Sequence, residues 1–254
     1  MLDVMTVADK GGVFHLTLNR PEKRNALNDA TIAALDAFFS AVPQAARVVV
    51  VSGAGGHFSS GLDLSEQVHR QPLEVMAHSR HWHAVMDRIQ HCRVPVVAAM
   101  TGAVMGGGLE FAAACHVRVA EETVKFRMPE GLRGIFVGGG GSVRIAKIIG
   151  GDRLTEMMLT GRTYSGLEGE RLGLAHYAVP QGEALPRAFE LAGRIAENSP
   201  AINTLIVNAI ARIGAMPPEA GLYAESLAAA LSQTGPDAEE GLRAFLEKRK
   251  PDFR

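Results

Sequence analysis

Short apolar runs alternate with amphipathic segments over most of the chain. Runs rich in β-branched residues predict strands, namely Val13–Leu18, Arg47–Val51, Pro95–Met100, Val117–Ala120, Val124–Phe126 and a last one that ends at Val179. Helical periodicity and capping residues predict helices, namely Thr31–Val42 after the cap Asn28, Glu66–His91, Leu109–Cys115, Val143–Ile149, Asp152–Leu159 and one after the cap Ser165. Strands that alternate with helices are typical of an α/β domain.

The pattern changes near residue 190. Helical segments follow one another without a strand from there on, namely Ala184–Asn198, Pro200–Ile213, Glu219–Ser232 and Ala238–Lys248. We therefore expect a core domain over residues 1–190 and a separate helical region over residues 191–254.

Composition narrows the class of protein. Hydrophobic residues make up 47% and charged residues 21% of the 254 positions, which favours a large buried core over disorder. The net charge of −1 gives no global reason to expect nucleic acid or an anionic membrane as a partner. The N-terminus lacks the pattern of a signal or transit peptide, and the two cysteines, Cys92 and Cys115, are too few for a disulfide framework. The expectation is a cytoplasmic protein.

Glycine-rich loops carry the candidate chemistry. They are SGAGGHFSSGLDL at 52–64, TGAVMGGGLE at 101–110 and FRMPEGLRG at 126–134. Loops of this kind expose backbone amides, and the first amides of a helix suit an oxygen that gains negative charge. The middle loop has neither the spacing of a dinucleotide-binding motif nor that of a Walker loop. An ordinary surface loop is the alternative interpretation of the first of them.

Two carboxylates lie in these loops. Glu110 follows the GGGL run and Glu130 stands between Pro129 and Gly131. Each has a simple alternative role, Glu110 in compensating a helix dipole and Glu130 in a turn. Together with two amides, however, they could add water to an alkene conjugated with a thioester, since one carboxylate would take a proton and the other would give one.

Five segments resemble the crotonase, or enoyl-CoA hydratase/isomerase, superfamily. In chain order they are LNRPEKRNALN, GGHFSSGLDL, PVVAAMTGAVMGGGLEFAAACHVRVAE, FRMPEGLRGIFVGGGGSVR and AFLEKRKPDF. The resemblance implies a spiral of ββα units with a helical C-terminal region that forms trimers, which often pair into hexamers. It also implies an acyl-CoA thioester as substrate, with no metal or redox cofactor.

The resemblance assigns roles residue by residue. The oxyanion amides fall on Leu62 and Gly107, while Glu110 would position or deprotonate water and Glu130 would exchange the proton at the α-carbon. Implied contacts to coenzyme A fall on Lys23, Arg24, Ala26, Ser60, Leu62, Asp63 and Leu64, with Phe245 and Lys248 reaching the coenzyme A of a neighbouring subunit. Implied acyl-pocket residues are Trp82, Met86 and Phe136; packing of an amphipathic helix is the alternative for Trp82 and Met86.

Two positions depart from the family pattern, and both concern the acyl pocket. Leu62 stands where alanine is common, and IFVGGGG, around Phe136, replaces a Pro-Gly-Ala-Gly-Gly run. Hydration of a 2-enoyl-CoA is the activity expected. The alternatives are an isomerase, which generally needs only the position of Glu130, another acyl-CoA lyase or hydrolase, and a non-catalytic acyl-CoA-binding or RNA-binding member.

Histidines cluster in the segment before the second glycine loop, at His69, His78, His81, His83 and His91. The spacing of His78 and His81 raises the question of a metal site. No third ligand stands at a supporting spacing, so we expect none.

Overall fold

The computed structural model describes residues 4–66 and 70–253, and a six-stranded sheet forms its centre. The strands lie in the order β1-β2-β3-β4-β6-β9, with β1 antiparallel to β2 and each later neighbour parallel. Their bounds are Met5–Asp9 (β1), Val13–Leu18 (β2), Val48–Gly53 (β3), Val96–Met100 (β4), Val117–Glu121 (β6) and Tyr177–Val179 (β9).

A smaller sheet of three strands carries the segments that flank the glycine loops. It consists of Ala103–Met105 (β5), Lys125–Arg127 (β7) and Thr163–Tyr164 (β8) in the order β5-β7-β8. Because β5 and β7 run parallel, they bring the starts of the GGGLE and MPEG segments side by side.

Helices connect the parallel strands and form the C-terminal region. They are Asp29–Ser40 (α1), Pro72–Gln90 (α2), Gly107–Ala114 (α3), Gly141–Ile149 (α4), Gly151–Thr160 (α5), Gly166–Leu172 (α6), Ala184–Ala196 (α7), Pro200–Ile213 (α8), Pro218–Gln233 (α9) and Pro236–Leu246 (α10). Short 3-10 turns cover Pro21–Lys23, Ala54–Gly56, Leu64–Glu66 and Glu130–Arg133.

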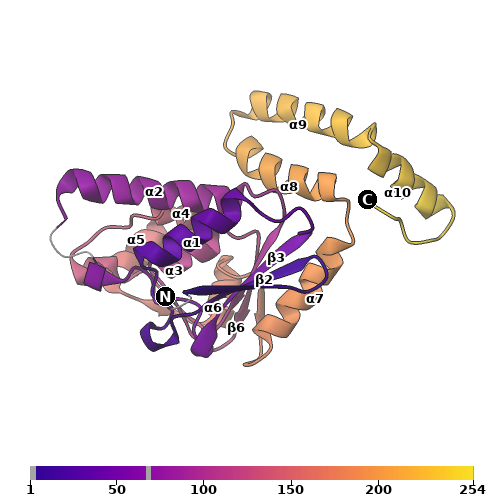
Figure 1. The fold of residues 1–254 in the computed structure, drawn as a ribbon. Helices are drawn as coiled ribbons and strands as arrows, with labels where there is room; N and C mark the ends of the chain where they lie inside the picture. Colours follow the sequence, from indigo (N-terminus) through magenta and orange to yellow (C-terminus); the bar gives the residue numbers. More distant parts are fainter. Residues whose placement is uncertain (1–3, 67–69, 254) are drawn as a thin grey trace.

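Two hydrophobic cores lie on the two faces of the large sheet, because successive side chains of a strand point to opposite faces. Val49 and Val51 face the larger core, in which helices such as α1 and α2 pack. Val48 and Val50 face the smaller core, which α7 covers with Ala188 and Leu191. Figure 1 shows α7 along the sheet on the side away from α1 and α2.

The predicted caps are confirmed. The side chain of Asn28 accepts the amide of Thr31 at 3.0 Å and starts α1, and Ser165 accepts the amide of Glu168 at 3.2 Å and starts α6. Strands β1, β5 and β8 were not predicted. β1 exposes four of its five residues, and β5 and β8 have three and two residues, so none shows an apolar period.

The prediction of one helix over Glu66–His91 is wrong at its N-terminal end. Leu64–Glu66 is a 3-10 turn, and α2 starts at Pro72, where a fixed φ suits the first helical turn. The carboxylate of Glu74 accepts the amide of Gln71 at 2.7 Å and closes a capping box. The remainder of the predicted range before Arg70, residues 67–69, lies outside the described residues.

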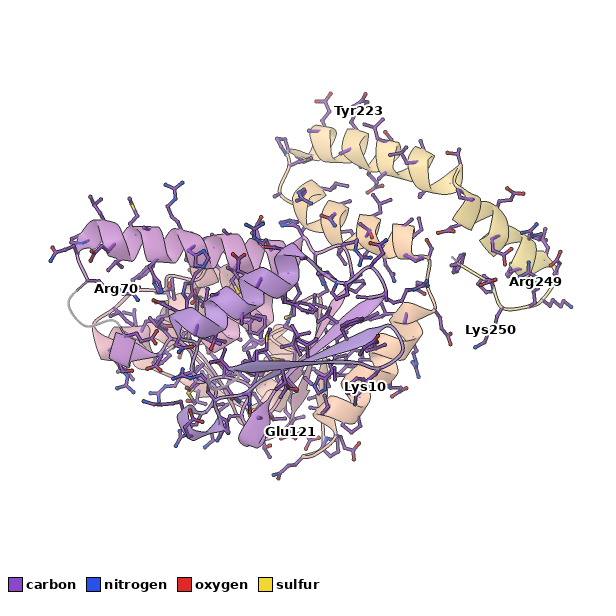
Figure 2. The ribbon with its side chains drawn as sticks, viewed as in Figure 1. Lys10, Arg70, Glu121, Tyr223, Arg249 and Lys250 are labelled. Carbon is purple, nitrogen blue, oxygen red and sulfur yellow. The ribbon has the colours of Figure 1, made fainter. Side chains whose placement is uncertain are left out.

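Residue 190, the expected domain boundary, lies inside α7, which packs on the sheet through Ala184–Ala192. The helices that extend from the core begin instead with α8, and together α8, α9 and α10 form an arm (Figure 1). Figure 2 shows Tyr223, Arg249 and Lys250 on this arm, far from Arg70 beside α2. Among the described residues, no helix is long and apolar enough to span a membrane.

Candidate active site

Two backbone amides meet where the first two glycine loops approach each other. A Cβ atom on Gly107 would lie 3.3 Å from the nitrogen of Leu62, and one on Gly61 would lie 3.0 Å from the nitrogen of Gly107. Only glycine permits this approach at Gly61, whose φ is +93°. Neither the amide of Leu62 nor that of Gly107 donates a hydrogen bond to any described residue. Both donors are therefore available to an oxygen.

Glu110 lies in the first turn of α3 and is 3% exposed. Its Oε1 accepts the amide of Gly139 at 2.9 Å and that of Gly141 at 2.7 Å. Oε2 makes no hydrogen bond with the described residues. The glycine run thus fixes one oxygen of the carboxylate and leaves the other for a ligand.

Glu130 begins the 3-10 turn after β7 and is 6% exposed. Its buried Oε2 has no hydrogen-bond partner among the described residues. A Cβ atom on Gly106 would lie 3.0 Å from Oε1, so the carboxyl stands against the residue that precedes the Gly107 amide. A buried oxygen without a partner favours the protonated acid.

Both carboxyls titrate above their usual range. Burial raises the pKa of Glu130 to about 7, and the negative charge of Glu110 adds to the rise. Burial also raises the pKa of Glu110, but the two glycine amides and the positive charge of Arg144 oppose this rise. The two amide hydrogen bonds favour the ionised form of Glu110, whereas Glu130 lacks such donors and exchanges its proton near neutral pH.

An open cavity of about 410 Å³ reaches Glu110. Its walls are mostly apolar, and its lining comes from the first loop, α2, α3 and the segment before α4, namely Leu62, Leu64, Val75, His78, Ser79, Trp82, Glu110, Ile135, Phe136, Val137, Gly138 and Gly139. An apolar cleft with a few convergent polar groups is the usual form of a small-molecule site.

Of the expected acyl-pocket residues, Trp82 and Phe136 line this cavity and Met86 does not. Met86 is fully buried in the hydrophobic core, one turn beyond Trp82 on α2. In this structure Met86 therefore packs in the core, the alternative interpretation for this residue, rather than lining the cavity. Phe136 is 73% exposed, at the mouth of the cavity.

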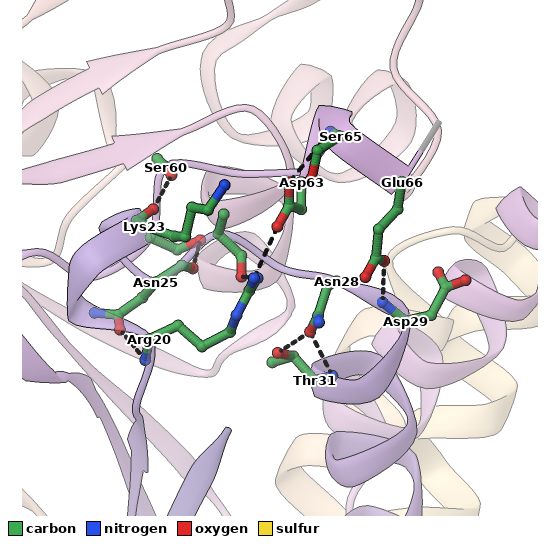
Figure 3. Close-up of polar contacts among 12 residues, drawn as sticks. Arg20, Lys23, Asn25, Asn28, Asp29, Thr31, Ser60, Asp63, Ser65 and Glu66 are labelled. Atoms are coloured by element: carbon green, nitrogen blue, oxygen red, sulfur yellow. Dashed lines mark hydrogen bonds and ion pairs between the residues drawn. The ribbon is translucent and has the colours of Figure 1, made fainter. Parts of the chain in front are cut away.

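Of the residues expected to contact coenzyme A, Lys23, Ser60 and Asp63 lie together at the first loop (Figure 3). Ser60 donates its amide to the carbonyl of Arg24 at 2.9 Å and its hydroxyl to the carbonyl of Lys23 at 3.0 Å. Asp63 forms an ion pair with Arg20 at 2.9 Å, and Ala26 is buried beneath it. Ser60 and Asp63 thus hold the two segments together, and the side chains of Lys23 and Arg24 remain exposed.

Phe245 and Lys248 lie at the end of the arm, and Phe245 is 80% exposed. The arm carries them away from α2 and α3 of their own chain (Figure 1). They are therefore not part of the site that this chain builds alone.

The residues that the sequence did not assign are Gly139, Gly141, His78 and its partner Asp29. Nε2 of His78 lies 2.8 Å from Oδ1 of Asp29, and His81 is exposed. No group of three potential metal ligands occurs among the described residues, and His69 lies outside them.

Comparisons with known proteins agree with this geometry. The enoyl-CoA hydratase/isomerase family matches residues 8–254. The 2,3-dehydroadipyl-CoA hydratase of Escherichia coli is 32% identical over 98% of this chain and 98% of its own, and the short-chain-enoyl-CoA hydratase of Clostridium acetobutylicum is 31% identical over 98% and 97%.

Solved structures agree as well. One from Rhodopseudomonas palustris is 48% identical, with a TM-score of 0.94 over 98% of this chain and 96% of its own. The enoyl-CoA hydratase of Bacillus anthracis is 31% identical, with a TM-score of 0.93 over 99% of both chains. The chain therefore belongs to the enoyl-CoA hydratase/isomerase family of enzymes, and its fold is the crotonase spiral followed by C-terminal helices.

Proposed function

We propose that this protein is an enoyl-CoA hydratase, which adds water to the C2–C3 double bond of a 2-enoyl-CoA and forms a 3-hydroxyacyl-CoA. One observation carries the proposal: two buried carboxyls with different hydrogen-bond partners, Glu110 and Glu130, stand beside two unpaired amides, and Glu110 and Leu62 line the cavity. Addition of water needs a proton acceptor, a proton donor and a site for the charge that develops on oxygen.

The amides of Leu62 and Gly107 supply the site for that charge. As water attacks C3, electrons move from the double bond to the thioester oxygen, which becomes an enolate oxygen. Two N–H groups directed at this oxygen stabilise it, and loss of one such donor costs about 3 kcal/mol in comparable enzymes.

The two glutamates divide the proton transfers. Oε2 of Glu110 accepts a proton from water while the oxygen of that water bonds to C3. Glu130 gives its proton to C2, which restores the thioester carbonyl. The product gains one water molecule, and the proton on Glu110 replaces the one lost by Glu130 through exchange with solvent before the next turnover.

The same proposal extends to coenzyme A and to assembly. Lys23 and Arg24 are exposed beside the first loop and suit the phosphates of the cofactor portion of the substrate. Phe245 and Lys248 would reach the coenzyme A of a neighbouring subunit in a trimer. The carboxyls and amides account for every proton and charge of the addition, so we expect no metal or redox cofactor.

The test measures loss of the conjugated-enoyl absorbance of short, medium and aromatic 2-enoyl-CoAs. The wild-type protein is expected to hydrate at least one of them, and Glu110→Gln and Glu130→Gln are each expected to lower kcat by roughly 10²–10⁴-fold. Absence of hydration across the whole panel would contradict the proposal.

An isomerase of the same family is distinguished by the products. Mass spectrometry shows a gain of water for a hydratase and an unchanged mass for a shift of the double bond. An isomerase would retain most of its rate in Glu110→Gln and lose it in Glu130→Gln. The two hydrogen bonds from backbone amides that position Glu110 favour the hydratase.

A further inference from the structure

The cavity contains one polar feature that hydration does not use. His78 lines the wall together with Trp82, and Nε2 of His78 lies 2.8 Å from Oδ1 of Asp29 and 3.2 Å from Nε1 of Trp82. Asp29 also accepts a hydrogen bond from Arg70 at 2.8 Å. The remaining walls are apolar apart from Ser79 and Glu110.

The hydrogen-bonding groups at this position are unbalanced. A carboxylate only accepts, so Nε2 of His78 carries the proton that it gives to Asp29. The indole N–H of Trp82 also only donates, and the protonated Nε2 cannot accept from it. The indole N–H of Trp82 is directed at Nε2 at 3.2 Å, but Nε2 cannot accept it while giving its own proton to Asp29.

The contacts of Trp82 show where the His78–Asp29 pair lies relative to the two loops that hold the oxyanion amide and Glu110. A Cβ atom on Gly107 would lie 2.8 Å from Cζ3 of Trp82, and one on Gly139 would lie 3.1 Å from Cε3. The benzene edge of the indole thus touches both the oxyanion loop and the loop that holds Glu110. The N–H edge lies on the opposite side of the indole from these two loops, at His78.

We propose that Trp82, His78 and Asp29 form a subsite for a hydroxyl group on the distal part of the acyl chain, so that the substrates are hydroxylated 2-enoyl-CoAs. This inference rests on the proposed function of the same cavity. The hydroxyl oxygen accepts the indole N–H, and the hydroxyl proton is donated to the carboxylate of Asp29. The apolar walls contact the carbon skeleton.

The charges oppose a distal carboxylate. No lysine or arginine is among the described residues that line the cavity, whereas Glu110 lies on its wall. Near the subsite, Arg70 is already paired with Asp29, and the carboxylate of Glu66 accepts the amide of Asp29 at 2.9 Å (Figure 3). A carboxylate on the substrate would find no positive partner here and would be repelled by these negative charges. A neutral hydroxyl avoids this repulsion and the cost of burying an unpaired charge.

The experiment compares kcat/KM for matched substrates. The aliphatic pair is 2-hexenoyl-CoA and 6-hydroxy-2-hexenoyl-CoA, the aromatic pair is cinnamoyl-CoA and 4-hydroxycinnamoyl-CoA, and 2,3-dehydroadipyl-CoA supplies the carboxylate. The wild type is expected to favour the hydroxylated member of at least one pair by about tenfold or more. The pair that shows the preference identifies the skeleton, and the carboxylate is expected to react more slowly than hexenoyl-CoA.

Variants connect the preference to the subsite. His78→Leu is expected to reduce the ratio to about one, and His78→Gln is expected to restore part of the ratio. His81→Leu is the matched control on the exposed face of α2 and should retain the full ratio. Equal rates within both pairs, a preference for the carboxylate, or a ratio unchanged in His78→Leu would overturn the proposal.

Failure of the proposed function gives a different result. If no enoyl-CoA in the panel is hydrated, titration calorimetry still measures whether the subsite binds a hydroxyl group. The matched ligands are hexanoyl-CoA with 6-hydroxyhexanoyl-CoA, and 3-phenylpropanoyl-CoA with its 4-hydroxy form. Tighter binding of a hydroxylated member by about tenfold, lost in His78→Leu, would support the subsite without hydration. Equal affinities within both pairs would reject it.

Discussion

At the level of single residues, Glu110 and Glu130 have the same side chain and nearly the same burial but different partners. Glu110 accepts two backbone amides, whereas Oε2 of Glu130 has no partner among the described residues. The motifs identify both positions. They do not show that the amides held by Glu110 come from Gly139 and Gly141, about 30 residues further along the chain, because only folding brings these segments together.

The unpaired carboxyl of Glu130 should lower stability at alkaline pH. Its pKa rises from 4.5 to about 7 in the folded protein. This shift lowers the free energy of unfolding by roughly 3 kcal/mol once the carboxyl is ionised. Because the folded-state pKa is raised, the protonated form is favoured on folding, and the penalty develops as pH rises from 4.5 through 7. Glu130→Gln is expected to be more stable than the wild type at pH 8.5 by several degrees in Tm.

Thermal unfolding of both proteins at pH 5 and pH 8.5 checks this expectation. At pH 5 most of the wild-type penalty is absent, so the two Tm values should nearly coincide. A variant that gains the same Tm at both pH values, or gains none at pH 8.5, would show that ionisation of Glu130 is not the cause.

At the level of elements, the turn at the start of α4 holds the carboxylate of Glu110 on α3. Two amides of the Gly138–Gly141 run donate hydrogen bonds to Glu110. Neighbouring glycines in this run are not equivalent. A Cβ atom on Gly139 would lie 2.7 Å from Oε2 of Glu110, whereas one on Gly138 would meet only Ser79, at 3.6 Å.

Gly139→Ala is therefore expected to displace the Glu110 carboxylate and lower kcat by at least about tenfold, with a small effect on Tm. Gly138→Ala is the matched control, since its methyl group would make an ordinary contact, and it should retain most of the activity. Steady-state kinetics with the best substrate of the panel measure both. Similar rates for the two variants would contradict the positioning role of Gly139.

At the level of the whole molecule, the arm of α8, α9 and α10 lacks the apolar contacts that cover the core. Large apolar side chains on α9 and α10 are exposed, for example Leu231 at 74%, Leu242 at 66% and Phe245 at 80%. An apolar surface of this kind is typical of an interface. We therefore expect this surface to contact other copies of the chain, as in the trimer that the family resemblance implies.

A charge placed on that surface is expected to prevent assembly. Leu231→Asp should convert a trimer into a monomer, because an unpaired carboxylate in an apolar interface costs several kcal/mol. Light scattering coupled to size exclusion measures the mass. Leu159→Asp, at a residue of α5 that is 76% exposed outside the arm, is the control and should leave the trimer intact. A monomeric wild type would contradict the expectation directly.

The sequence by itself determined the local features. Asn28 and Ser165 start their helices, β2 and α8 have the predicted bounds, and the ordered motifs identify the family and its two glutamates, because these features depend on neighbours along the chain. Only the tertiary structure decided which amides Glu110 accepts, that Met86 is buried away from the cavity, that α7 completes the core, and that His78 meets Asp29. Each of these depends on contacts between segments far apart in sequence, where packing rather than local preference sets the position of a side chain.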